Sequence, residues 1–195
     1  MMIQRAVLSA RADFYQRADA TFGHNAFLNY VRKHSPDIWS IGWQVGVTAV
    51  LPVAMFPGGR FEFADQGESA FVCEAIAADG ETVTDLVAWH LDNPGRPVTM
   101  FGRCGLVGLW QANAPGTYFM GASLRLHRSP LSWLQSGCEG AAIVDRTVAG
   151  GQLIDVPGRI AAEDKAHGRD IAGLLRAAAD IDNKVIIPVQ LGRAA

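Results

Sequence analysis

The chain has 195 residues, of which 49% are hydrophobic and 18% are charged, and its formal net charge at pH 7 is −2. These values are typical of a globular protein and exclude an intrinsically disordered chain, which has fewer apolar and more charged residues. The slightly negative net charge also argues against a dedicated nucleic-acid or membrane-surface protein, because such proteins carry an overall positive charge.

Two amphipathic helices are predicted at the start of the chain, over residues 3–18 and 25–34. Apolar residues recur there at helical spacing, with basic side chains on the opposite side. The Ser35-Pro36 pair ends the second helix, because the residue before proline disfavours the helical conformation. We therefore expect residues 1–36 to form an N-terminal helical arm, and we expect a homo-oligomer to assemble through these helices.

The stretch 38–56 carries no charged residue and is long enough to cross a membrane as a helix. Its valines favour strands, however, and Pro52 and the following Pro57-Gly58-Gly59 turn interrupt it. We interpret this stretch as buried strands, with a membrane helix as the alternative, and we expect no membrane partner.

A β-hairpin gives the clearest strand signal in the chain. Two apolar runs, over residues 70–78 and 82–91, flank the dipeptide Asp79-Gly80, which is typical of a tight hairpin turn. Upstream, the alternating sequence RFEF at 60–63 predicts a third antiparallel strand.

A strand–helix–strand unit is predicted over residues 124–145. The first strand covers 124–127, and the second covers 141–145. Between them, Ser129 is a favourable N-cap residue and Pro130 suits the first helical position.

The rest of the chain completes the predicted fold. Residues 152–158 are expected to be a short extended or turn segment, and residues 162–179 a helix. Residues 184–189 are expected to be a terminal strand, which Pro188 places at a sheet edge. These elements predict an α+β fold, with a mixed, mainly antiparallel sheet, helices on one face and the helical arm. Residues 37–195 are expected to form one domain.

The patterns of the common catalytic and cofactor sites are absent. The sequence contains no G-x-S-x-G, no phosphate-binding glycine loop, no dinucleotide-binding pattern and no zinc-ligand spacing. We therefore expect no cofactor and favour a non-enzymatic protein. Three cysteines without a C-x-x-C pair and a start without a secretory signal favour the reducing cytoplasm.

One acidic cluster is a candidate metal or catalytic site. If residues 162–179 are helical, Glu163, His167 and Asp170 are spaced i, i+4, i+7 and share one face. Such a row can bind a divalent metal or act as an acid–base set. The preferred interpretation is a capped helix start, where acidic residues interact with the positive end of the helix.

A second candidate site is a set of arginines with aromatic residues between them. Residues 96–128 contain no carboxylate, and their arginines are Arg96, Arg103, Arg125 and Arg128. Arginines contact phosphates and aromatic rings stack on bases, so these four are the predicted nucleic-acid-binding residues. The alternative is that the aromatic residues build the core.

Three stretches together suggest relatives of this chain. The sequences DLVAWHL, LRLHRSPLSWLQSGC and AAEDKAHG resemble those of a group of small uncharacterised bacterial proteins, found near phage-like and mobile-element genes. The resemblance covers roughly residues 60–180. It implies a setting, a phage or mobile element, and it implies no activity and no site residues.

These observations lead to three hypotheses of different classes. The leading one is a non-enzymatic cytoplasmic binding or accessory protein of a phage or mobile element, whose partner is a nucleic acid or a host protein. The first alternative is a metal-dependent enzyme acting on nucleic acid or nucleotide through Glu163, His167 and Asp170. The second is a structural oligomeric component.

Overall fold

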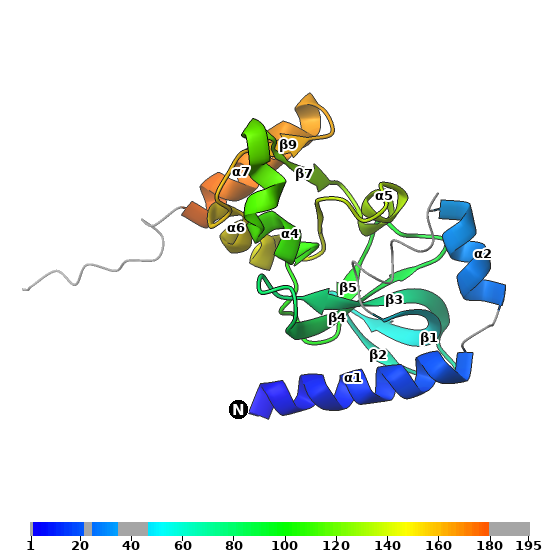
Figure 1. Ribbon diagram of the computed structural model, residues 1–195. Coiled ribbons are helices and arrows are strands. Elements are labelled where there is room, and N and C mark those ends of the chain that lie inside the picture. The colour runs from blue at the N-terminus through cyan, green and yellow to red at the C-terminus, as the bar shows by residue number, and fades with distance from the viewer. Residues whose placement is uncertain (1, 22–24, 35–46, 180–195) are drawn as a thin grey trace, which may run out of the picture.

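The computed structural model describes residues 2–21, 25–34 and 47–179. It contains helices and two sheets of mixed strand direction, and it confirms the expected α+β class. Figure 1 shows a small barrel in the lower half of the molecule and a second sheet with its helices above it.

The first sheet is a closed barrel of five short strands. In spatial order they are β1, β2, β5, β4 and β3. All neighbours are antiparallel except β2 and β5, which close the barrel in parallel. The strands cover Thr48–Phe56 (β1), Arg60–Phe63 (β2), Glu68–Ile76 (β3), Val83–His90 (β4) and Val98–Thr99 (β5). A closed barrel has no free edges, which limits edge-to-edge aggregation.

The predicted hairpin and the predicted third strand are both confirmed. β3 and β4 pair on either side of the Asp79-Gly80 turn, where Gly80 has φ 78°. The Asp79 carboxylate accepts the backbone N–H groups of Glu81 and Thr82, each at 2.9 Å, which fixes the turn. β2 pairs antiparallel with β1, as the RFEF alternation predicts.

The uncharged stretch 38–56 contributes β1, and the part before residue 47 lies outside the described residues. Pro52 sits within β1 opposite Ser69 of β3. Alternate residues of β1 are buried, which agrees with the interpretation as a strand. Among the described helices, none is both long and apolar enough to span a membrane.

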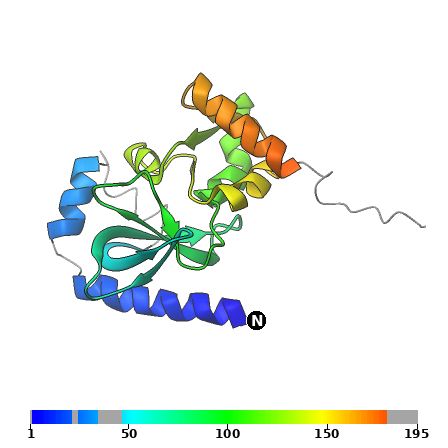
Figure 2. The ribbon, with the colours of Figure 1, turned by 180° about the vertical axis from the view of Figure 1, so that it is seen from behind.

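The two N-terminal helices form where they were predicted, as α1 (Met2–Thr21) and α2 (Asn25–His34). Both views place α1 along the barrel, on the side away from the second sheet (Figures 1 and 2). Phe14 of α1 is fully buried among the barrel side chains. Buried Glu74 of β3 accepts hydrogen bonds from Arg11 Nε at 2.6 Å and from the Tyr15 hydroxyl at 2.9 Å. The helix is therefore part of the barrel's packing.

The second sheet contains four short strands in the order β6, β8, β7, β9. β7 runs parallel to both β8 and β9, and β6 pairs antiparallel with β8. The strands cover Leu106–Val107 (β6), Leu124–His127 (β7), Ala141–Ile143 (β8) and Ile160–Ala162 (β9). The helices of this half are α4 (Leu109–Asn113), η1 (Pro115–Gly121), α5 (Pro130–Gln135), α6 (Arg146–Ile154) and α7 (Lys165–Ala179).

The predicted strand–helix–strand unit is confirmed as β7, α5 and β8. Ser129 caps α5 by accepting the Ser132 backbone N–H at 3.2 Å. The Ser132 hydroxyl in turn accepts the Ser129 backbone N–H, which completes a capping box. The helix ends at Gln135, and Gly137, two residues further on, has a positive φ of 75°, the conformation that commonly follows a helix end.

Two predictions for the last third of the chain are correct only in part. Residues 152–154 belong to α6, which Asp145 starts by accepting the Thr147 N–H at 2.8 Å. The last helix begins at Lys165 and not at 162, because residues 160–162 pair with β7 as β9. The predicted strand 184–189 lies outside the described residues.

The barrel and the second sheet share one buried core. Phe71 and Trp89 of the barrel stack with ring centroids 4.5 Å apart. They belong to the same cluster as Trp133 and Cys138 from the second half. The Trp89 indole also donates to the Tyr30 hydroxyl of α2 at 2.9 Å. These contacts hold the two sheets and α2 together.

Candidate functional site

The carboxyl ends of three parallel strands meet at one edge of the second sheet. His127 ends β7 and is followed by Arg128, and the end of β9 is followed by Glu163 and Asp164. In open sheets with parallel strands, ligands commonly bind at this edge. We therefore treat it as the first candidate site and call it the polar edge, defined by these four residues with His167 and Asp170.

His127 is a buried member of the polar edge, with a side chain only 6% exposed. Its Nε2 lies 3.0 Å from the carbonyl oxygen of Glu139, which can only accept, so Nε2 carries the proton. Its Nδ1 lies 3.5 Å from the Glu163 carboxylate. Burial lowers the pKa of His127, and the contacts with Glu139 and Glu163 oppose this shift.

Arg128 joins the polar edge to the start of α7. Its guanidinium lies 2.7 Å from Asp164, 3.4 Å from Glu163 and 3.9 Å from Asp170. Asp164 also caps α7 by accepting the His167 backbone N–H at 2.8 Å. The hydrogen bond from the His167 backbone, and to a lesser extent the contact with Arg128, lower the pKa of Asp164 to about 2. Arg128 therefore pairs with both acidic residues that precede the helix and offsets part of their negative charge.

The proposed metal-binding set, Glu163, His167 and Asp170, does not come together as predicted. Glu163 precedes α7, so it does not share a helical face with the other two. His167 is buried, and its Nδ1 accepts the backbone N–H of Glu163 at 3.3 Å. Within the three described ranges, no three His, Cys, Asp or Glu side chains are grouped so that they could hold a metal ion.

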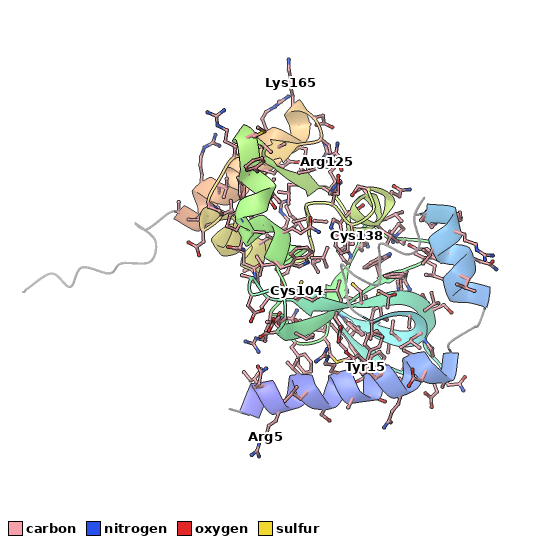
Figure 3. All side chains as sticks on the ribbon, viewed as in Figure 1. Arg5, Tyr15, Cys104, Arg125, Cys138 and Lys165 are labelled. Carbon is pink, nitrogen blue, oxygen red and sulfur yellow. The ribbon has the colours of Figure 1, made fainter. Side chains whose placement is uncertain are left out.

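The four predicted nucleic-acid-binding arginines lie on separate elements. Arg96 and Arg103 are exposed on the loops before and after β5 of the barrel. Arg125, which is labelled in Figure 3, lies on β7 with its side chain 62% exposed and 3.9 Å from Glu139. Arg128 already pairs with the carboxylates of Glu163, Asp164 and Asp170, so its positive charge is compensated within the protein and would attract a phosphate only weakly.

The polar edge also contains a serine–histidine–glutamate series that sequence reasoning missed. The Ser136 hydroxyl lies 3.3 Å from His127 Nε2, and His127 contacts Glu163. However, Ser136 sits at the negative end of α5 and donates to the Trp133 carbonyl at 2.7 Å. Carbonyl oxygens around a serine destabilise an oxyanion, whereas a hydrolase needs N–H donors there. This arrangement is suited to joining β7, α5 and β9.

The cysteines are buried thiols in the shared core, where Cys104 and Cys138 are labelled in Figure 3. Burial raises the pKa of the Cys138 thiol to about 12 and also raises those of Cys73 and Cys104. Because the thiolate is the nucleophile, such thiols are inert at neutral pH.

The second candidate site is an exposed apolar tip formed by Phe119 and Met120 in η1. These side chains are 71% and 91% exposed, the highest values among the large exposed hydrophobic residues of the described ranges. Behind them, the Tyr118 hydroxyl donates to the Ala112 carbonyl and the Thr117 hydroxyl to the Gln111 carbonyl, both at 2.7 Å. The base of the tip is therefore held in place.

The backbone of the apolar tip has an unusual conformation. Met120 has φ 53° and ψ 29°, in the left-handed region, and Phe119 before it is extended. A non-glycine residue there costs roughly 1–3 kcal/mol, and such strain is common at functional sites. The sequence PGTYFMG shows turn residues but does not show that its two large apolar side chains point outward.

No family model, no curated protein and no solved structure matches this chain. The two candidate sites therefore have to be interpreted from their own residues. The polar edge is satisfied by contacts within the protein, whereas the apolar tip presents side chains that are 71% and 91% exposed.

Proposed function

We propose that this chain is a non-enzymatic binding protein whose partner is a protein, bound through the apolar tip Phe119–Met120. The single observation that carries the proposal is the presentation of two adjacent apolar side chains, 71% and 91% exposed, on a strained turn whose base is held by hydrogen bonds. A partner groove that buries them would gain about 25 cal/mol per Å² of apolar surface.

The chemistry of the tip favours a protein over a nucleic acid as the partner. Phenylalanine and methionine are enriched at the cores of protein interfaces, where a few anchors supply most of the affinity. A nucleic-acid site needs a row of unpaired cations along the phosphates. Here Arg128 is paired with its carboxylates, and Arg125 has Glu139 3.9 Å away.

The geometry of the polar edge supports a non-enzymatic role. His127, Arg128 and Asp164 each have partners inside the protein, and the Ser136 hydroxyl faces carbonyl oxygens. These contacts leave no poised nucleophile or base at this edge. The proposal therefore assigns the polar edge to stability and the apolar tip to function.

The setting of this binding protein is also a proposal. Three free cysteines in the core support a reducing compartment and thus the cytoplasm. The resemblance of the stretches DLVAWHL and LRLHRSPLSWLQSGC supports an accessory protein of a phage or mobile element. On α1, Ile3 and Leu8 are 59% and 55% exposed, which supports a homo-oligomer through the N-terminal helices.

Site-specific photo-crosslinking tests the proposal. A benzoylphenylalanine replaces Phe119 in one variant and Phe56 in a matched control, where Phe56 is a 44%-exposed phenylalanine at the end of β1. Both proteins are irradiated in extracts of bacteria that carry the gene, and the products are identified by mass. We expect one discrete protein adduct from position 119 and none from position 56.

The partner found in this way is then produced and its affinity measured. The double substitution Phe119→Ala and Met120→Ala should weaken binding at least about tenfold, while Phe56→Ala leaves it unchanged. Equal adducts from both positions, or unchanged binding by the double variant, would refute the proposal. An adduct that nuclease treatment removes would show a nucleic-acid partner instead.

A further inference from the structure

An apolar groove runs along the outer edge of the second sheet. It has a volume of about 630 Å³ and lies between β9, the end of α6 and one side of α7. Among its lining residues are Leu153, Ile160, Ala162, Ala172, Leu175 and Ala179. Within the described residues the sheet ends at β9, so a strand that pairs there would lie against this groove.

The outer edge of β9 offers hydrogen-bonding groups to such a strand. The Leu124 N–H donates to the Arg159 carbonyl at 2.9 Å, so residues 159 and 161 direct their backbone groups towards β7. Successive residues of a strand alternate, and the N–H groups of Ile160 and Ala162 therefore point to the outer edge.

The direction of the chain favours a strand in this position. From β8 the chain crosses through α6 to β9, passing over β7 towards the outer edge. α7 then packs beside α6, as both views show (Figures 1 and 2). Crossovers between parallel strands are almost always right-handed. When the helices of two successive crossovers lie on the same face of a sheet, each crossover therefore adds its strand further along the sheet in the same direction. The strand after α7 is therefore expected beyond β9.

The sequence that follows α7 has the right composition and length. The helix ends at Ala179, which itself lines the groove, and the apolar sequence KVIIPV begins at residue 184. The intervening four residues match the usual length of such loops. α7 is about 22 Å long, and six extended residues span about 20 Å, so the segment can return along the helix.

We propose that residues 184–189 of the same chain bind in this groove as a fifth strand, parallel to β9. Continuous apolar runs are typical of parallel strands covered by helices. Pro188 has no N–H to donate and is tolerated on an edge strand when that position faces solvent. By alternation, Ile187 then directs its N–H towards β9 and Ile186 directs its N–H away.

Amide hydrogen exchange in the full-length chain tests this proposal. In the wild-type protein, the amides of Ile160 and Ala162 should be protected. The substitution Ile187→Pro removes a hydrogen bond to β9 and should speed exchange at both amides about tenfold or more. The control Ile186→Pro removes an isoleucine and an amide that faces solvent, and it should change exchange by less than about threefold.

The Ala161 amide, which faces β7, reports whether the sheet itself stays folded in each variant. Unprotected Ile160 and Ala162 amides in the wild-type protein would overturn the proposal, and so would equal effects of the two proline substitutions. Protection that appears only in a dimer, as seen by native mass spectrometry, would assign the groove to a second copy and would also overturn it.

Discussion

Asp85 holds the loop after the barrel through a carboxylate that is fully buried. Its Oδ1 accepts the backbone N–H groups of Leu86 at 2.8 Å and Phe101 at 2.9 Å. Its Oδ2 accepts those of Arg103 at 2.7 Å and Cys104 at 3.3 Å. This loop connects β5 to β6, so the carboxylate fixes the passage from one sheet to the other.

Asp85→Asn should destabilise the protein strongly although it barely changes side-chain volume. One carboxylate oxygen becomes an NH₂ group, which cannot accept and which faces two backbone donors. A buried donor left without a partner costs about 1–3 kcal/mol, so the two together cost about 2–6 kcal/mol. This is a large part of a typical stability of about 5–15 kcal/mol.

Urea unfolding at pH 7, followed by circular dichroism, measures this loss. The control is Asp65→Asn, whose side chain is 85% exposed and pairs only with Arg17 in the described contacts. An exposed ion pair contributes about 0–1 kcal/mol, so the control should stay within that range. A loss below about 1 kcal/mol for Asp85→Asn would refute the assigned role of the four hydrogen bonds.

The remaining predictions concern pH and assembly. Burial lowers the pKa of His127 and His167, so their contribution to stability is complete above the unfolded pKa of about 6.5 and is lost as the pH falls through the folded values. His167→Asn should flatten the slope of urea stability between pH 7.5 and 5, and an unchanged slope would contradict this. Asp164, with a folded pKa of about 2, should lose its contribution between about pH 4 and 2, and Asp164→Asn should remove that step. Ile3→Glu with Leu8→Glu should lower the native mass of an oligomer while the circular dichroism spectrum stays that of the folded chain, and a wild-type monomer would exclude this assembly.

Local signals were sufficient for part of the fold. The Asp79-Gly80 dipeptide predicts the hairpin because Gly80 readily takes the positive φ of the turn and Asp79 bonds to the backbone after it, and Ser129 with Pro130 predicts the start of α5. In both cases the residues that determine the structure are neighbours in the sequence.

Other elements depend on contacts between distant residues, and sequence patterns do not show these. α6 contains Gly150, an unfavourable helix residue, because a Cβ there would lie 2.8 Å from the Ala178 Cβ of α7. β9 has only three residues and exists through its pairing with β7. The predicted turn therefore included the last three residues of α6, and the predicted helix included Ala162 of β9.

The candidate sites show the same limit. Arg128 and Asp164 are 36 residues apart and meet only because β7 and β9 are neighbours. His127 gave no sequence signal, since its partners are the backbone of Glu139 and the carboxylate of Glu163. The exposure of Phe119 and Met120 depends on a left-handed backbone position that the sequence does not specify.

The core shared by the two sheets limits how this protein can be divided. Phe71 and Trp89 from the barrel and Trp133 and Cys138 from the second half bury one another. A fragment that ends after β5 would expose the apolar side chains that the barrel contributes to this core. A fragment that begins after β5 would expose those that the second sheet and its helices contribute. Recombination can therefore exchange surface turns such as the apolar tip, but it cannot transfer either sheet alone to another protein.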